Sequence, residues 1–452
     1  MQPSLDEEAP LTEESAAAHT GGICFKTGPP GRTGIELEWL VHDGRTPTAQ
    51  VAPARLDAVL GRLAAHGALP GGGVLTREPG GQIELSTPAA DSAAECVRSA
   101  AADQTVLFGA LAEEGLTAVG IGLDPLRSPP RVVDHPRYAA MERFFDRTGP
   151  WGRLMMRATA SVQINVDAGD DTDGPAGYRH RWWLAHRLGP VLVAAFANSP
   201  LRRGRPTGWR STRQEVWSRL DPGRTLPPPW PGPASGGLPG DPRAAWTRYA
   251  LDAAVLCVQR PAPADWSAPE GLTFRSWLRR PPPGWAPPRP ADLAYHLSTL
   301  FPPVRPRGWL ELRMIDAQRG PDWAVAVALV SALLDDPAAG DAAADATEPL
   351  TGGGPVPPAE VWARAARHGP ADPELGKAAR ACFAAAELAL ARDPDTAELR
   401  RMLSSFAERY PERGRCPADD WLDRHPPHGG PSRLHLGAAG RRLPASPQAP
   451  PA

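Results

Sequence analysis

Positive charge other than arginine is almost absent from this chain of 452 residues, because lysine occurs only at positions 26 and 377. We interpret this bias, together with the abundance of Ala, Pro and Gly, mainly as an effect of GC-rich coding. The net charge of -2 leaves no global field that could attract a polyanion. The sequence therefore argues against a nucleic-acid partner.

Cysteines are few, and no apolar run has the length of a membrane span. The five cysteines are odd in number and far apart, with no CxxC spacing, which fits a reducing compartment. Neither a signal peptide nor an apolar run of 18 residues is visible. We expect a cytoplasmic protein with no membrane partner and no obligate protein partner.

The common catalytic motifs are also missing. The sequence contains no GxxxxGK[ST] phosphate loop, no GxGxxG after a strand, no HExxH and no GxSxG. The eleven histidines are scattered, and we interpret His42, His135 and His296 as hydrogen-bonded structural residues rather than ligands. Any nucleotide chemistry must therefore use another scaffold.

Four segments alternate polar and apolar residues as strands with one polar face do. In the first, Gln82, Glu84 and Ser86 point one way, and the residues between them point the other. Charged groups rarely stand among Leu, Ile and Trp unless they are paired or bind an ion or ligand. We therefore predict a sheet with one apolar face, covered by helices, and one polar face. The other three segments are 34–39 with Glu36 and Glu38, 161–167 with Gln163 and Asn165, and 309–314 with Glu311 and Arg313.

The polar face offers groups for binding a metal and a phosphate. Carboxylates are hard oxygen ligands suited to Mg²⁺, and guanidinium groups bind phosphates and carboxylates bidentately. A network of structural ion pairs is the alternative interpretation of the same residues. The candidates are the acids Glu36, Glu38, Glu84 and Glu311 and the arginines Arg157, Arg213, Arg305 and Arg313.

The order of the predicted elements favours an α/β or α+β layer architecture. Residues 1–20 are predicted to be a mobile tail or frayed helix, 335–358 a flexible connection and 426–452 a disordered tail, which leaves 21–425 as a single domain. The Pro/Gly-rich segments 226–242 and 279–290 are predicted to be ordered surface loops or lids. Helices are predicted over 54–66, 92–115, 137–147, 181–197, 246–258, 322–334, 359–368 and 373–410, and a further strand over 117–122.

Seven motifs occur in one order between residues 21 and 425. They are Gly34–Trp39, Glu78–Ser86, Gly120–Pro125, Arg137–Tyr138 with Met141, Met155–Asn165, Asn198–Pro200, and Tyr295–Gly308 with Glu311–Arg313. Together they resemble the motifs of plant-type glutamate-cysteine ligases, and most of all those of the ergothioneine-pathway group. The resemblance implies an α+β, glutamine-synthetase-like fold: a curved, mainly antiparallel sheet with a polar active-site face and helices packed on the other face.

The resemblance also implies a reaction and roles for the residues. ATP and Mg²⁺ would drive ligation of the γ-carboxylate of L-glutamate to the amine of L-cysteine, through γ-glutamyl phosphate. Arg313 would face the transferred phosphoryl group, with Arg305 as a second catalytic arginine. The implied metal ligands are Glu36, Glu38, Glu84, Glu311 and Gln163. The implied glutamate-binding residues are Asn165, Asn198 and one of Arg157 and Arg213, although Asn198 also fits a helix C-cap before Pro200.

Three alternatives stay open. Ligation of glutamate or another carboxylate to a different amine would use every motif named above. A glycoside hydrolase also lines a sheet with paired carboxylates, but it would not need the arginines at 305–313. A non-catalytic binding module would consume no ATP with any pair of amino acids.

Overall fold

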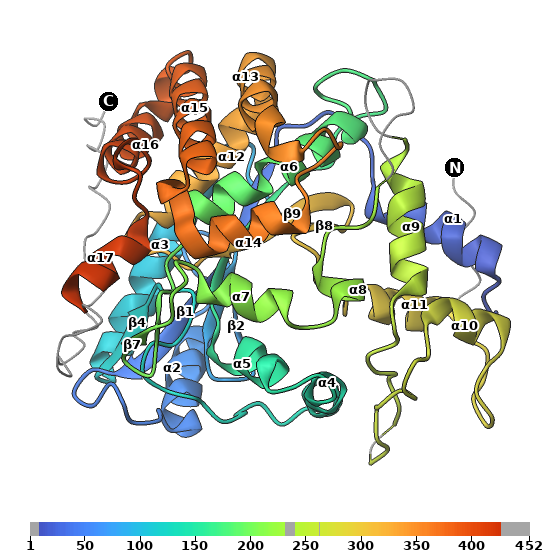
Figure 1. The fold of residues 1–452 in the computed structure, drawn as a ribbon. Coiled ribbons are helices and arrows are strands. Elements are labelled where there is room, and N and C mark those ends of the chain that lie inside the picture. The colour runs from blue at the N-terminus through green and yellow to red at the C-terminus, as the bar shows by residue number, and fades with distance from the viewer. Residues whose placement is uncertain (1–8, 231–239, 262, 426–452) are drawn as a thin grey trace.

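The computed structural model describes residues 9–230, 240–261 and 263–425 (Figure 1). Its centre is a seven-stranded sheet in the order β2-β3-β1-β5-β9-β8, with β4 paired to the end of β1. Every pairing between these strands is antiparallel, which confirms the predicted α+β class with a mainly antiparallel sheet. The strands are β1 (Thr33–Asp43), β2 (Val74–Arg77), β3 (Ile83–Ser86), β4 (Leu116–Val119), β5 (Ser161–Asp167), β8 (Val304–Pro306) and β9 (Trp309–Asp316); β6 (Leu201–Arg202) and β7 (Arg205–Pro206) form a separate hairpin.

The register of the sheet places the predicted polar residues side by side. Glu38 of β1 lies opposite Glu84 of β3, and Glu36 lies opposite Gln163 of β5. The register of β5 with β9 shifts between Val162 and Ile164, that is, at Gln163. Residues that are distant in sequence therefore share one face because alternate residues of each strand point the same way.

Helices cover the other face of the sheet. The strands' apolar residues, such as Ile35 and Leu37, are buried against α3 (Ala93–Glu113), α6 (Tyr178–Phe196) and α12 (Trp323–Asp335). The helices α13 (Pro337–Thr347), α15 (Pro373–Leu390) and α16 (Ala397–Arg409) form a further layer on α12, seen at the top of Figure 1. This arrangement confirms the predicted apolar face.

Shorter helices lie around the polar face and at the sides. They are α2 (Pro53–Ala65), α4 (Pro136–Asp146), α5 (Trp151–Ala158), α7 (Thr212–Ser218), α8 (Pro222–Thr225), α9 (Pro242–Asp252), α10 (Phe274–Arg279), α11 (Pro290–Leu297), α14 (Ala359–His368) and α17 (Pro417–Arg424). The predicted helices from 54–66 to 359–368 are thus present, although α9 begins and ends earlier than expected. No single described helix is long and apolar enough to cross a membrane; α12 and the segment 337–351, which meet at 100°, pass that test together on length and composition alone.

The N-terminal segment differs from its prediction. Residues 13–20 belong to the helix α1 (Glu13–Cys24), which Thr12 caps and which packs against α9. Glu13 pairs with Arg275 and Arg279 of α10. The buried residues of α1 are small, among them Ala16 and Gly21, so the sequence showed no apolar face. Residues 1–8 lie outside the described residues.

Two predictions near the C-terminus were wrong. The segment 335–358 is not a flexible connection, because it contains α13 and a 3₁₀ turn over Glu348–Thr351. Asp336 caps α13, and the small residues Ala339 and Ala343 of this helix are buried against neighbouring helices. The predicted helix 373–410 is two helices, α15 and α16, with a break at Asp393-Pro394. The tail predicted over 426–452 lies outside the described residues, as does part of the 226–242 loop.

Candidate active site

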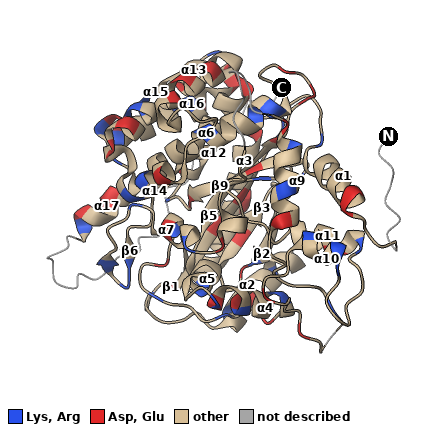
Figure 2. Cartoon of the chain, turned by 45° about the vertical axis from the view of Figure 1, so that its right-hand side comes forward, with Lys and Arg blue, Asp and Glu red and all other residues tan. Residues whose placement is uncertain are grey.

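The polar face of the sheet is the floor of a cleft of about 430 Å³, walled by residues of α4, α5 and α7 and by the segment that leads into β8. Figure 2 shows acidic residues in red on the central strands. The cleft is lined by the acids Glu36, Glu38, Glu78 and Glu84, by the arginines Arg137, Arg213, Arg305, Arg307 and Arg313, and by an apolar group of Met141, Met155, Met156, Trp217 and Phe301.

Four carboxylates in the cleft repel one another. Burial, followed by the charges of Glu311 and Glu84, raises the pKa of Glu36 to about 7. Burial, followed by Glu84 and Glu38, raises the pKa of Glu78 to about 8. Burial also raises the pKa values of Glu38 and Glu84. Buried carboxylates with raised pKa values are groups that favour binding a cation.

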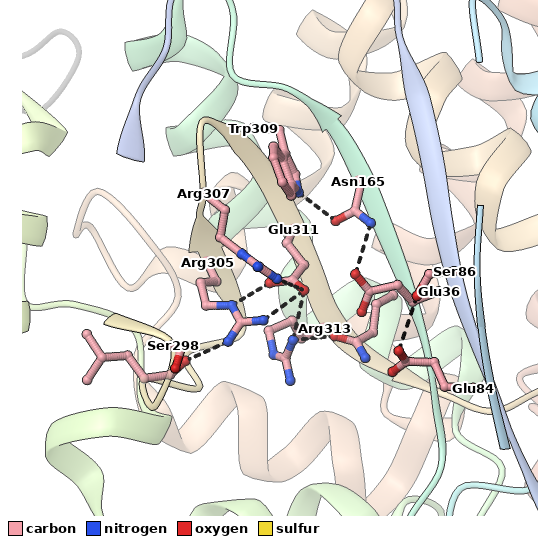
Figure 3. Close-up of polar contacts among 12 residues, drawn as sticks. Glu36, Glu84, Ser86, Asn165, Ser298, Arg305, Arg307, Trp309, Glu311 and Arg313 are labelled. Carbon is pink, nitrogen blue, oxygen red and sulfur yellow. Dashed lines mark hydrogen bonds and ion pairs between the residues drawn. The ribbon is translucent and has the colours of Figure 1, made fainter. Parts of the chain in front are cut away.

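Glu311 differs from these four acids because arginines surround it (Figure 3). Arg305 donates to both of its oxygens, at 2.5 and 2.9 Å, and Nη1 of Arg313 lies 3.0 Å from Oε1. Although burial raises its pKa, the two guanidinium groups lower the pKa of Glu311 to about 2. Glu311 also lies opposite Asn165 and Arg305 in the register of the sheet. It is therefore a fixed anion between two cations.

Two arginines of the cleft keep buried N–H groups without a hydrogen-bond partner among the described residues. These groups are Nη1 of Arg213 and Nε of Arg313. The other contacts of the two side chains hold them in place: Arg213 donates to the carbonyl oxygen of Arg313, and Arg313 donates to Oε1 of Gln163. A buried donor without a hydrogen bond costs roughly 1–3 kcal/mol, so Nε of Arg313 favours an oxyanion ligand. Nη1 of Arg213 has the carboxylate of Asp316 at 3.8 Å as an ion-pair partner.

Asp316 positions the helix that carries Arg213. Its carboxylate accepts from the hydroxyls of Ser199 and Ser211, at 2.7 and 2.9 Å, and lies 3.8 Å from Nη1 of Arg213. Ser211 is the N-cap of α7, so this buried carboxylate fixes the start of the helix. Arg213 enters the cleft from the second residue of α7.

Residues 32–437 of the chain match the model of glutamate-cysteine ligase family 2 (GCS2). The chain belongs to this family. It is 41% identical over 436 residues to glutamate-cysteine ligase EgtA of Mycobacterium tuberculosis, with 93% of each chain covered, and 42% identical over 414 residues to that of Mycolicibacterium smegmatis, with 91% covered. The chloroplastic glutamate-cysteine ligase of Arabidopsis thaliana is 29% identical over 331 residues, which are 68% of this chain and 60% of that one.

A solved structure of glutamate-cysteine ligase from Francisella tularensis in complex with AMP is also similar, with 14% identity and a TM-score of 0.47, over 90% of this chain and 86% of that one. The predicted family is confirmed by the family match and by the curated relatives, and the chain is a ligase.

The cleft of this ligase brings together most of the predicted metal-binding and catalytic residues. Glu36, Glu38, Glu84, Gln163, Arg213, Arg305 and Arg313 line it. Glu311 lies directly behind them, in contact with Arg305. Asn165 lies at the margin, where its amide donates to Glu36 at 3.4 Å and accepts from Nε1 of Trp309.

Like Asn165, two further residues predicted to hold glutamate lie outside the cleft lining. Arg157 is paired with Glu142 at 2.5 Å. Asn198 is buried: its amide donates to the carbonyl oxygens of Gly120 and Ala317 and accepts from Nε1 of Trp421. Nor does Asn198 form the helix C-cap, because α6 ends at Phe196 and its C-cap is Ala197. It joins three distant segments of the chain instead.

Glu78 is a cleft residue that the alternation pattern missed. It precedes the turn at Gly80-Gly81, where the strand period has not yet begun. The backbone of Glu78 donates to Gln82, and a Cβ at Gly80 would lie 1.9 Å from the carbonyl oxygen of Arg157. Glycine therefore lets this turn pack directly on α5. The Glu-Pro-Gly-Gly sequence was the only signal of a tight turn that could carry an acid into the cleft.

The donor set of the cleft fits Mg²⁺ in its chemistry. Within the described ranges, no group of three or more His, Cys, Asp or Glu side chains converges as it stands on a point that could hold an ion. The available ligands are nevertheless all oxygens, as Mg²⁺ prefers, and Mg²⁺ usually keeps waters and shares substrate phosphates. A divalent cation would also offset the repulsion that, after burial, raises the pKa values of Glu36 and Glu78.

A second, more open hollow of about 1160 Å³ lies between α1 and α9. Its charged residues include Glu13 and Arg275, which are paired with each other. Asp171, which also lines it, is paired with Arg243. The acids of the smaller cleft have raised pKa values instead, so we place the candidate active site there.

Proposed function

We propose that this ligase joins the γ-carboxylate of L-glutamate to the amine of L-cysteine and converts ATP to ADP and phosphate. The observation that supports this most strongly is the combination, in one cleft, of crowded carboxylates and guanidinium N–H groups that have no hydrogen-bond partner among the described residues. ATP and glutamate both bring oxyanions to such a site. The relatives named glutamate-cysteine ligase support the choice of glutamate and cysteine.

In the first step, a γ-carboxylate oxygen of glutamate attacks the terminal phosphorus of ATP, and the bond to the bridging oxygen of ADP breaks. An enzyme lowers the barrier to such a transfer mainly by neutralising charge and by aligning the reacting groups. Nε of Arg313, which has no hydrogen-bond partner in the described part of the chain, would donate to the transferred phosphoryl group. Arg305 holds Glu311 in place through its paired contacts. Glu36, Glu38, Glu78, Glu84 and Glu311, with Gln163, would hold Mg²⁺, which would supply positive charge against the phosphates.

Arg213 is the residue that we propose for the α-carboxylate of glutamate. Arg213 lines the cleft, and its Nη1, which lies 3.8 Å from the Asp316 carboxylate, has no hydrogen-bond partner among the described residues. Arg157 and Asn198 would then act only through the positions of α5 and of the segment after α6. Asn165 would support the site through Glu36.

In the second step, the cysteine amine attacks the acyl carbon of γ-glutamyl phosphate. The carbon–oxygen bond to phosphate breaks, the amine loses a proton, and phosphate leaves. The apolar wall of Met155, Met156 and Trp217 offers the acceptor's side chain a surface without charge. An acyl phosphate already has a good leaving group, so no protein thioester is needed.

We further propose that the product, γ-glutamylcysteine, serves ergothioneine biosynthesis, in keeping with the motifs and the relatives named EgtA. A reducing, cytoplasmic compartment is proposed because all five cysteines are free thiols.

The test is phosphate release from ATP with Mg²⁺ and glutamate, with cysteine and other amines varied in turn and the product identified by mass spectrometry. We expect γ-glutamylcysteine, linked through the amine. A clearly higher kcat/KM with another amine would instead establish the alternative, a glutamate ligase with a different acceptor. No phosphate release with any pair would refute ligation itself.

A further inference from the structure

Trp309 is the one aromatic residue among the exposed large hydrophobic side chains of the described residues, with 38% of its surface accessible. It begins β9, on which Glu311 and Arg313 follow at steps of two residues. Alternate residues of a strand share a face, so the indole stands on the same face as these two groups. Arg307, its close neighbour, forms part of the cleft lining. Trp309 therefore lies at the rim of the cleft.

The indole is held in a fixed orientation (Figure 3). Its Nε1 donates to Oδ1 of Asn165 at 3.0 Å, and the same amide donates to Oε1 of Glu36 at 3.4 Å. The guanidinium carbon of Arg307 lies 5.4 Å from the ring centroid. A ring that is already ordered loses little conformational entropy when it binds a flat ligand.

We propose that Trp309 and Arg307 form a stacking platform for the purine base of ATP, an inference that rests on the proposed function. Aromatic rings and guanidinium planes both stack on nucleobases, and they do so whatever the base. An exposed indole beside an arginine at the edge of a phosphate-binding cleft offers both surfaces at once.

The spacing along β9 supports this assignment. Trp309 and Arg313 are four residues apart, which in a strand is roughly 13 Å. An extended nucleoside triphosphate has a similar length from its terminal phosphate to its base. With the terminal phosphoryl group at Arg313 and Glu311 beside the phosphate chain, the base reaches Trp309. The order of the three side chains thus follows the order of the groups in ATP.

The test compares the binding of ATP with the binding of inorganic triphosphate, both with Mg²⁺ and without glutamate, by isothermal titration calorimetry on the full chain. We expect Trp309→Ala to weaken ATP binding roughly tenfold or more, the loss of one stacked base, and to leave triphosphate binding unchanged. Trp309→Phe keeps a stacking ring but lacks the N–H, so it should bind ATP within about threefold of the parent.

The contacts of Trp309 with Asn165 define the result that would overturn the proposal. If Trp309→Ala weakened ATP and triphosphate equally, the residue would act only by supporting Glu36. Unchanged ATP affinity in Trp309→Ala would also refute the platform. Circular dichroism and the melting temperature check that the variant folds, and Trp309→Leu, which keeps bulk without a ring, replaces it if it does not.

Trp285 provides a matched control. Arg260 lies over its ring at 4.3 Å from the centroid, but the pair packs beside the cluster of α9 and α10 and not at the cleft. Trp285→Ala should bind both ligands as the parent does. A parent protein that uses no ATP with any amino-acid pair would refute the proposed function; a parent that uses ATP, with Trp309→Ala at the same KM for ATP, would refute only the platform.

Discussion

The two faces of the central sheet bury different kinds of side chain: apolar ones on one face and carboxylates on the other. On β1, Ile35 and Leu37 are 0% and 1% exposed beneath the helices, where each such side chain contributes roughly 1.5–3 kcal/mol to stability. The alternate residues Glu36 and Glu38 are half-buried in the cleft. There, burial raises the pKa values of both acids, so their ionised forms oppose folding at neutral pH. One face of the strand therefore stabilises the fold, and the other face carries acids whose charge destabilises it.

A second contrast lies within the cleft itself. Arginines lower the pKa of Glu311 to about 2, whereas burial and then the neighbouring acids raise the pKa of Glu78 to about 8. A network of structural ion pairs accounts for Glu311, because its charge is matched. It does not account for Glu78, because no arginine in the described part of the chain matches the charge of that carboxylate. The unmatched acids are those whose ionised forms would gain most from a bound cation.

The largest expected effect is a loss of activity on changing Glu84, and it contrasts with a loss of stability on changing Leu85, which points to the other face of the sheet. Glu84→Gln removes a metal-binding charge but no volume, so ligation should fall about a thousandfold or more, roughly 4 kcal/mol in the barrier. Leu85 is fully buried, and Leu85→Ala should cost about 2–5 kcal/mol of unfolding free energy. Phosphate release and urea unfolding measure the two quantities.

Each of these variants serves as the control for the other. Glu84→Gln should unfold at a urea concentration at or above that of the parent, because it relieves repulsion. The turnover rate of Leu85→Ala, corrected for the fraction of the variant that is folded, should stay within about threefold of the parent. A fully active Glu84→Gln, or a folded Leu85→Ala without turnover, would contradict the assignment of catalysis to one face.

The next effect concerns Arg313. Lysine cannot reproduce the guanidinium contacts with Gln163, Glu311 and a phosphoryl group, so Arg313→Lys should lower kcat about a hundredfold, or roughly 2.7 kcal/mol. The control is Arg153→Lys, since Arg153 forms an exposed pair with Asp146 on the outer side of α5. Steady-state kinetics with varied ATP measure both. Near-parent activity in Arg313→Lys would place that residue outside the phosphate site.

A smaller effect on stability comes from the helix layer. Burial lowers the pKa of His186 on α6 from 6.5 to about 4. As pH falls below 6.5 the unfolded chain takes up this proton before the folded one does, so stability present at pH 7 is lost toward pH 4. Between pH 7 and pH 5 the parent should lose about 2 kcal/mol more unfolding free energy than His186→Gln. Equal losses in urea unfolding at the two pH values would contradict a buried neutral histidine.

The smallest effect is expected from the cysteines. Burial raises the pKa of the Cys96 thiol to about 11 and that of Cys382 to about 12, so both stay protonated. Both belong to the apolar core on the helix side of the sheet. Each single change of Cys24, Cys96, Cys257, Cys382 or Cys416 to Ala should keep turnover within about tenfold, or roughly 1.4 kcal/mol. A stably folded variant without turnover, or a trapped glutamyl-enzyme, would point to a covalent mechanism instead.

Local patterns in the amino-acid sequence are enough to define the strands and their faces. Alternation with a period of two depends only on neighbouring residues, so it places Glu36, Glu84 and Arg313 on the polar sides of their strands. The family can be recognised for a similar reason, because its motifs are short and contiguous. These predictions need no knowledge of which segments meet.

Features that depend on distant neighbours were set by the tertiary fold. Asn198 accepts a hydrogen bond from Trp421, 223 residues away, and this contact, not its own surroundings in the sequence, makes it part of the scaffold. Glu78 enters the cleft because a glycine turn packs on α5, and α1 is ordered by the close packing of small residues. Hydrophobic periodicity cannot show such packing, because Ala and Gly bury well without forming an apolar stripe.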